Sequence, residues 1–376
     1  MKTWLVKVKD VAYDVDDILD EWTTETLISK AANEGDGSCF SKKKVRSFLL
    51  PVTCFNRVML RHKIGRRIKE EVNEVPFVIS IVGMGGMGKT TLAQLTYNDE
   101  KVKGHFDKRM WVCVSEDFDV KRITKSIIES ADESGCEDLG LDLLQSRLSQ
   151  KLQAKRFLLV LDDIWSEDRE KWDKLRLPFQ AGALGSRIVI TTHSEKVAWA
   201  MRSAHIHKLV ALSKDECCLL FSRGAFEHRN AEEHSELEEI GREIVNKCGG
   251  LPLAAKTIGC AMWWRRTKRE WELVLESKIW NSGDILGGIL PALLLSYHDL
   301  PPALKQCFAY CSIYPKDWRI EKDMIVKLWV AQGFICSKGS QDMEEIGGQY
   351  FDDLLRRSLL QDAVLDDDDD DDDDQK

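Results

Sequence analysis

The residues with the most specific chemistry form a glycine-rich run that ends in lysine and threonine. Residues 83–91 read Gly-Met-Gly-Gly-Met-Gly-Lys-Thr-Thr and satisfy the phosphate-loop pattern GxxxxGK[ST]. The glycines allow backbone N–H groups to turn toward phosphate oxygens, and a following helix adds its positive N-terminal end. An apolar run at 77–82 precedes the loop and a helical run at 91–97 follows it. The sequence therefore predicts a site for nucleotide phosphates, with a ligand-free glycine turn as the alternative.

The side chains of this loop have separate expected roles. Lys89 is expected to reach the β- and γ-phosphates, Thr90 to ligate Mg²⁺, and Thr91 to touch the α-phosphate. The predicted phosphate-loop contacts of the nucleotide are Gly83, Met84, Gly85, Gly86, Met87, Gly88, Lys89, Thr90 and Thr91.

Two consecutive aspartates end another apolar run, at residues 157–161. A central strand of a parallel sheet delivers its last residues to the edge where ligands bind. Asp162 is therefore expected to hold Mg²⁺ through water, and Asp163 is the candidate catalytic residue that orients an attacking water. A solvated turn is the alternative interpretation of this pair.

A third polar cluster follows the apolar run at 188–191. Thr192 and His193 come at its end and are expected at the same sheet edge, where they could sense a γ-phosphate. A purely structural role is an equal alternative, because a strand that ends in polar residues is common.

The elements that must position these residues form an alternating pattern. Short apolar runs at 77–82, 110–114, 157–161, 188–191 and 206–210 alternate with helical stretches, which predicts βαβ units and a five-stranded parallel sheet. From residue 213 the strands stop. A helix is expected over 237–248, ended by Gly249-Gly250, and another begins at Leu251-Pro252.

The two ends of the chain have different patterns. Apolar residues recur at heptad spacing between Trp4 and Trp22, which predicts a helix packed on another helix. A basic stretch at 42–69 is expected to lie against the acidic face of that helix, with a nucleic-acid or phospholipid patch as the alternative. The aspartate run at 366–374 is expected to be extended and disordered.

Composition excludes several classes of protein. The formal net charge of −9 comes from the aspartate run, so nucleic-acid binding is not expected. No apolar run approaches the ~20 residues of a membrane span, and the N-terminus has no signal peptide pattern. The 11 cysteines lack zinc spacing; Cys307 and Cys311 are expected in a core, and His205 with His207 is too small a set for a metal. A reducing compartment is expected, the cytoplasm or also the nucleus.

Eight blocks along the chain form a further, ordered pattern. The blocks are VAYDVDDILDEW at 11–22, GMGGMGKTTLAQLTYND at 83–99, FDKRMWVCVSEDFDV at 106–120, FLLVLDDIW at 157–165, GSRIVITT at 185–192, CGGLPLAAKTIG at 248–259, LKQCFAYCSIYPKD at 304–317 and LWVAQGFI at 328–335. In this order they resemble the blocks of one family, the nucleotide-binding (NB-ARC) proteins of plant disease resistance, coiled-coil class. The family belongs to the signalling branch of the P-loop ATPases.

This resemblance implies a switch that holds ADP at rest and exchanges it for ATP when activated. It implies that Pro252 packs near the adenine, that the winged-helix region clamps the ADP state, and that the N-terminal helical segment contacts protein partners. The sequence departs from the family pattern in several places. His193 stands where the family has a sensor arginine, and the His-Asp pair, the Gly-Arg motif and the leucine-rich repeats are not recognised. A truncated member of the family is therefore expected.

The expected fold class is an α/β P-loop NTPase domain followed by an all-α domain and a partial winged-helix domain. The expected domains are a helical, partial coiled-coil segment at 1–74, the nucleotide-binding domain at 75–212, a helical domain at 213–284, a partial winged-helix domain at 285–365 and the acidic tail at 366–376. The expected function is an ADP/ATP-binding switch with slow ATP hydrolysis or none. Two alternatives stay open: a non-switching module that pairs with full-length resistance proteins, and a P-loop ATPase with sustained turnover.

Overall fold

The computed structural model describes residues 77–115, 117–132, 135–226, 235–282, 289–314, 318, 320–335 and 342–360. The predicted heptad helix, the basic stretch at 42–69 and the aspartate run at 366–374 lie outside the described residues.

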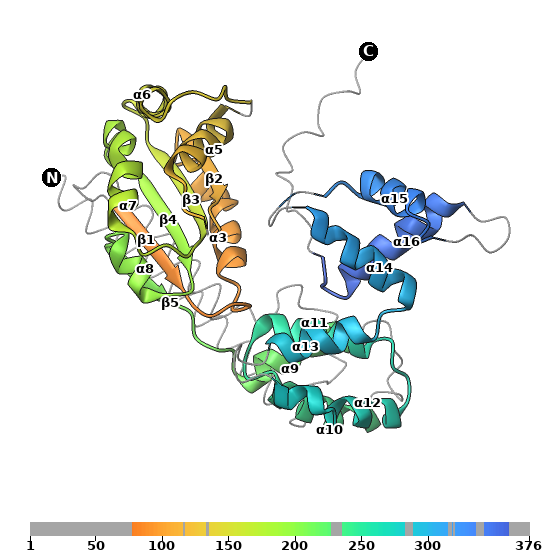
Figure 1. The fold of residues 1–376 in the computed structure, drawn as a ribbon. Helices are drawn as coiled ribbons and strands as arrows, with labels where there is room; N and C mark the ends of the chain where they lie inside the picture. The colour runs from red at the N-terminus through yellow and green to blue at the C-terminus, as the bar shows by residue number, and fades with distance from the viewer. Residues whose placement is uncertain are drawn as a thin grey trace, which may run out of the picture.

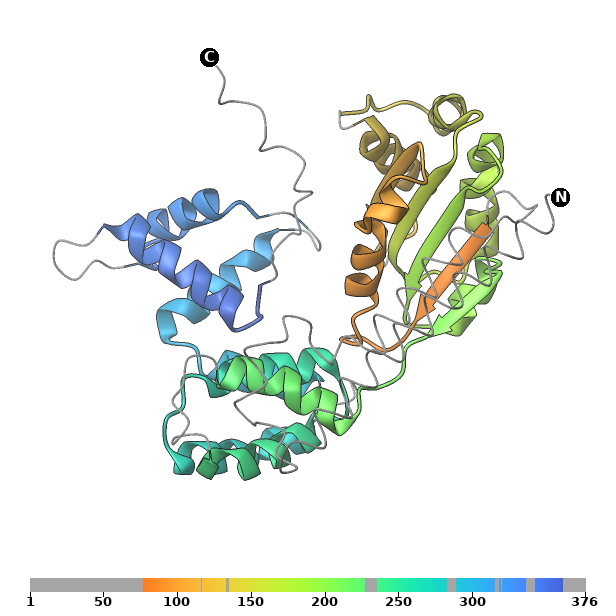
Figure 2. The ribbon, with the colours of Figure 1, turned by 180° about the vertical axis from the view of Figure 1, so that it is seen from behind.

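The described chain forms three bodies that follow one another along an arc. Figure 1 shows the α/β body at one end, the helical body at the base of the arc and the C-terminal helical body on the other side. The view from behind in Figure 2 has the same order. None of the helices in the described part of the chain is both long and apolar enough to cross a bilayer.

The α/β body alternates strands and helices, as the sequence predicts. Its strands are β1 (Phe77–Val82), β2 (Lys108–Cys113), β3 (Phe157–Ile164), β4 (Arg187–Thr192) and β5 (His205–Lys208). Its helices are α3 (Lys89–Tyr97), α4 (Glu100–Lys103), α5 (Val120–Asp132), α6 (Leu141–Leu152), α7 (Arg169–Arg176), the 3₁₀ helix η2 (Leu177–Ala181) and α8 (Glu195–Ala200).

The five strands form one sheet in the order β2-β3-β4-β1-β5, with every pair parallel. The prediction of a five-stranded parallel sheet is confirmed. Strand β4 lies between β1, which leads into the phosphate loop, and β3, which ends in the two aspartates. All three therefore deliver their carboxyl ends to one edge, where ligands of parallel sheets bind.

Both faces of the sheet are buried, which explains the continuous apolar runs. One face packs against α5, α6, α7 and α8, and the other against α3 and α4. Residues of one strand alternate between these faces, so Leu158 and Val160 of β3 join one core whereas Leu159 and Leu161 join the other.

The second body is wholly helical in its described part. It contains α9 (Lys214–Ala225), α10 (Ser235–Lys247), α11 (Pro252–Met262), α12 (Lys268–Leu275), the 3₁₀ helix η3 (Lys278–Ser282) and α13 (Ile289–His298). Helix α11 lies at its centre, because it contacts both α9 and α13. Two glycines, one on α9 and one on α11, allow close packing of these helices: a Cβ on Gly259 would lie 2.5 Å from the Phe221 carbonyl oxygen, and one on Gly224 would lie 2.7 Å from the Cys260 nitrogen.

The third body has its own core, around the fully buried Trp329. It contains α14 (Pro302–Tyr310), the 3₁₀ helix η4 (Cys311–Ile313), α15 (Lys322–Ala331) and α16 (Met343–Arg356). Cys307 is buried in this core and Cys311 packs against it, as predicted from their apolar surroundings.

Candidate nucleotide-binding site

The phosphate loop connects the end of β1 to the start of α3. Gly86 and Gly88 have φ angles of 70° and 82°, a left-handed conformation that glycine adopts without a steric cost. Gly88 is the N-cap of α3, so the first turn of the helix points its free N–H groups at the loop. The start of the loop is tied to the neighbouring strand, because the Gly83 N–H donates to the Thr192 carbonyl at 3.2 Å.

Lys89 folds back over this loop. Its Nζ donates to the Met84 carbonyl oxygen at 3.1 Å. Burial lowers the pKa of Lys89 below its ordinary value, and the nearby charges of Asp163 and Asp162 oppose that shift. The ammonium group therefore contacts a carbonyl acceptor in the loop and is within electrostatic range of the two carboxylates of β3. An anionic phosphate bound at this loop would find a cation here.

Thr90 and Asp162 lie within hydrogen-bond distance of each other. The Thr90 hydroxyl donates to Asp162 Oδ1 at 3.0 Å, although the residues come from α3 and β3. A hydroxyl and a carboxylate are oxygen ligands of the kind that Mg²⁺ prefers. The described residues contain no cluster of three or more His, Cys, Asp and Glu side chains that could hold a metal. The pair thus fits a Mg²⁺ ion that takes its other ligands from phosphates and water.

Asp162 and Asp163 occupy an irregular step at the end of β3. Leu161 pairs with Ile190 and Ile164 pairs with Thr192, so two aspartates on β3 face one residue, Thr191, on β4. That two-against-one arrangement is a β-bulge. The extra residue also explains why Leu161 and Ile164, three positions apart, belong to the same core.

Thr191 is the residue that sequence reasoning missed. Its hydroxyl donates to Asp162 Oδ1 in a short hydrogen bond and accepts the Asp163 N–H at 2.9 Å. Thr191 is fully buried, so its hydroxyl has no access to solvent. Its position at the polar end of β4 could have indicated a role, but the sequence pattern led to a prediction only for the next two residues, Thr192 and His193.

The two predicted sensor residues have different surroundings. Thr192 is buried, and its hydroxyl accepts the Ser194 N–H at 3.3 Å just before α8. His193 is exposed and lies against the ring of Trp165, with 4.1 Å between the ring centroids. Of the two, His193 is the side chain that remains available at the sheet edge.

The helical body touches the phosphate loop directly. The Leu253 N–H, in the first turn of α11, donates to the Gly86 carbonyl at 3.2 Å. The Met87 side chain is only 4% exposed and belongs to the core of the helical body, not to that of the sheet. Pro252, the residue before this contact, is buried at the start of α11. The structure therefore brings α11 to the loop, at a point far from it in sequence.

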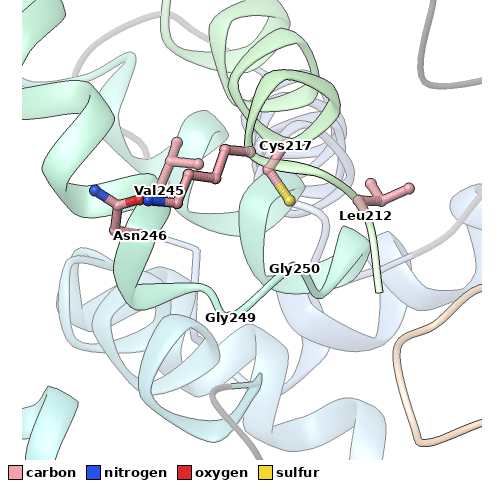
Figure 3. A pocket seen from close by; sticks show the side chains of 7 residues that line it. Leu212, Cys217, Val245, Asn246, Gly249 and Gly250 are labelled. Atoms are coloured by element: carbon pink, nitrogen blue, oxygen red, sulfur yellow. The ribbon is translucent and has the colours of Figure 1, made fainter. Parts of the chain in front are cut away.

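A pocket of about 230 Å³ opens beside this junction. Its lining residues come from the β5–α9 connection, α9, the end of α10 and the α10–α11 turn: Leu212, Lys214, Cys217, Val245, Asn246, Gly249 and Gly250 (Figure 3). The predicted nucleotide contacts are not among them. The pocket is therefore lined by the helical body and by its connection to β5.

Three family models match successive parts of the chain. They describe an Rx N-terminal domain at residues 1–54, an NB-ARC domain at 59–231 and a disease resistance protein winged helix domain at 313–376. Among curated proteins, "Disease resistance protein RGA2" of Solanum bulbocastanum is 40% identical over 96% of this chain and 42% of its own length. "Putative disease resistance RPP13-like protein 1" of Arabidopsis thaliana is 46% identical over 76% of this chain and 27% of its own length. The chain belongs to the NB-ARC disease-resistance proteins of plants.

This NB-ARC protein therefore carries the nucleotide-binding domain of a family of switches in plant immunity. The chain spans about two fifths of the length of the RGA2 relative. Among solved structures, Cdc6p from Pyrobaculum aerophilum is 17% identical, with a TM-score of 0.44 over 86% of this chain and 90% of that one.

Proposed function

We propose that this NB-ARC protein is a switch that holds ADP at rest, exchanges it for ATP on activation, and hydrolyses ATP slowly or not at all. The observation that carries the proposal is the contact between the phosphate loop and the helical body. Gly86 accepts a hydrogen bond from α11, and Met87 is buried in the helical core. A loop built in this way cannot change its conformation around phosphates without disturbing α11, which is what a switch requires.

The proposed nucleotide contacts follow from the geometry of the loop. The backbone from Gly83 to Thr91 would surround the phosphates, with the Lys89 ammonium as their cation. Thr90 and Asp162 would hold Mg²⁺, which when bound neutralises phosphate charge. Asp163 would orient water, and His193 would meet the γ-phosphate end. Pro252 would pack near the adenine, because α11 begins beside the loop.

Partners and location are part of the same proposal. The N-terminal segment at 1–74 would contact other resistance proteins or signalling components, and the protein would act in the cytoplasm. The alternative of a non-switching interaction module predicts a folded protein that carries no nucleotide. One measurement therefore distinguishes the switch from this alternative.

That measurement is the nucleotide content of the purified protein. We expect stoichiometric ADP to be released when the protein is denatured, identified by ion-pair chromatography. The Lys89→Ala variant should lose it. Lys89 is half-buried, and a bound phosphate would cover it further. Removing one partner of a buried charge pair costs roughly 2–5 kcal/mol, or about 30-fold or more in Kd. Lys101→Ala removes an exposed lysine of the same domain and is the matched control. A folded wild-type protein without nucleotide, or undiminished ADP affinity in Lys89→Ala, would overturn the proposal.

A further inference from the structure

Successive residues of a regular strand point to opposite faces of the sheet. Asp162 and Asp163 are successive residues, yet both carboxylates lie near enough to Lys89 for their charges to act on it. The pairing with β4 shows that the strand departs from regular geometry at this step. The bulge opposite Thr191 is that departure, since two residues of β3 occupy the space of one there.

The bulge imposes an unusual backbone on Asp163. Its φ angle is 60°, a left-handed conformation that is uncommon for any residue with a side chain. Such a conformation persists only where surrounding contacts enforce it. One contact that holds Asp163 in this conformation is the hydrogen bond from its N–H to Thr191 Oγ1 at 2.9 Å.

The same hydroxyl fixes the neighbouring carboxylate. The Thr191 hydroxyl donates a hydrogen bond to Asp162 Oδ1, the same oxygen that accepts a hydrogen bond from the Thr90 hydroxyl. Asp162 is 5% exposed, so water contributes little to its orientation. One buried hydroxyl therefore accepts from the backbone of Asp163 and donates to the side chain of Asp162, and it can do both because a hydroxyl has one donor and two acceptor sites.

We propose that Thr191 is a positioning residue: its hydroxyl closes the bulge in β3 and thereby sets both aspartates for Mg²⁺ and water at the nucleotide. The inference rests on the proposed function, because it requires a nucleotide and Mg²⁺ to bind at this edge. Thr191 itself does not touch the ligand. It acts through Asp162 and Asp163, in the way that outer partners orient metal-binding carboxylates.

The test separates metal-dependent from metal-independent nucleotide binding. Thr191→Val keeps the shape of the side chain and removes the hydroxyl. We expect its ADP affinity in EDTA to equal that of the wild type. In the presence of Mg²⁺, the ADP affinity of the variant should rise as in the wild type, but the Mg²⁺ concentration at half of that rise should be about tenfold higher or more. Loss of a hydrogen-bond partner of a metal ligand typically weakens metal binding by about that factor. Binding of a fluorescent ADP analogue, titrated with Mg²⁺, measures both quantities without relying on hydrolysis.

Matched variants isolate the hydroxyl. Thr191→Ser should restore the wild-type Mg²⁺ dependence, because serine retains the donor and the acceptor. Thr124→Val removes another fully buried hydroxyl of the same domain, which donates to the Val120 carbonyl within α5, and should leave the Mg²⁺ dependence unchanged. If Thr191→Val does not fold, the comparison of Thr191→Ala with Thr191→Ser still differs by the hydroxyl alone.

The outcomes distinguish this inference from the proposed function. Unchanged Mg²⁺ dependence in Thr191→Val, with ADP binding lost in Lys89→Ala, would overturn the positioning role of Thr191 but not the proposed function. If Thr191→Val instead lost ADP binding equally with and without Mg²⁺, Thr191 would have a merely structural role, and the inference that it positions the aspartates would be overturned as well. Undiminished ADP binding in Lys89→Ala would instead overturn the proposed site.

Discussion

At the scale of single residues, Asp163 differs from Asp162 in its surroundings. Asp162 is 5% exposed and accepts hydrogen bonds from Thr90 and Thr191, whereas Asp163 is only half-buried and is held through its backbone N–H. The carboxylate held by two hydroxyls suits a fixed metal site, and the more accessible one suits contact with a water molecule. The sequence alone, which has two adjacent aspartates, gives no basis for this difference in burial.

Replacement of Asp163 by alanine tests that division of roles. We expect Asp163→Ala to keep ADP affinity within about twofold, because Thr90, Lys89 and Asp162 remain. The single-turnover rate of ATP hydrolysis should fall by about 100-fold or more, the usual contribution of a residue that activates water.

The control for this variant is Asp142→Ala, which removes an exposed carboxylate from the first turn of α6. Its rate and affinity should match the wild type. Loss of ADP binding in Asp163→Ala would contradict the prediction and assign Asp163 to the structure of the bulge.

At the scale of elements, the turn between α10 and α11 determines how the helical body meets the sheet. Gly249 and Gly250 both have positive φ angles, 60° and 78°. The Gly250 carbonyl accepts the Leu212 N–H at 2.9 Å, so this turn is bound to the segment that leaves β5. A Cβ on Gly250 would lie 2.8 Å from the Ala211 Cβ and 2.9 Å from the Leu212 carbonyl oxygen, whereas a Cβ on Gly249 would meet nothing within 4 Å.

Alanine at these two positions should therefore have unequal effects on stability. Gly249→Ala should cost about 1 kcal/mol of unfolding free energy, the price of a left-handed conformation for a residue with a side chain. Gly250→Ala should cost about 2 kcal/mol or more, because the Ala211–Leu212 segment must also move. Differential scanning calorimetry of the two variants measures the difference, and equal midpoints of the first transition would contradict it.

The elements show which features the sequence could predict and which it could not. The terminator Gly249-Gly250 and the start of α11 at Pro252 were predicted correctly, because both depend on local backbone chemistry. The end of β5 was predicted at residue 210 but lies at Lys208, which pairs with Val82 where β1 ends. Strand ends and the bulge opposite Thr191 depend on the partner strand, and the sequence of one strand does not contain that information.

At the scale of the whole molecule, the phosphate loop belongs to two bodies at once. Its Lys89 and Thr90 face the sheet edge, whereas Met87 enters the core of the helical body. The sequence predicted the loop itself but not this contact, because Gly86 and Leu253 are distant along the chain and meet only in the folded protein. If nucleotide state is transmitted to the rest of the molecule, this junction is a direct hydrogen-bonded and packed connection from the phosphate loop to α11.

Two methionines in the same loop allow that connection to be tested. Met87 is 4% exposed and Met84 is 58% exposed. We expect Met87→Ala to leave ADP binding largely intact, because the loop contacts phosphates through its backbone and Lys89. The variant loses the side chain that packs in the helical core, so the helical body should no longer respond to the nucleotide. Limited proteolysis should give wild-type protein different cleavage rates with ADP and with ATP, and Met87→Ala should give equal rates. Met84→Ala, the control, should behave as the wild type, and an ADP–ATP difference that persists in Met87→Ala would show that the signal leaves the loop by another route.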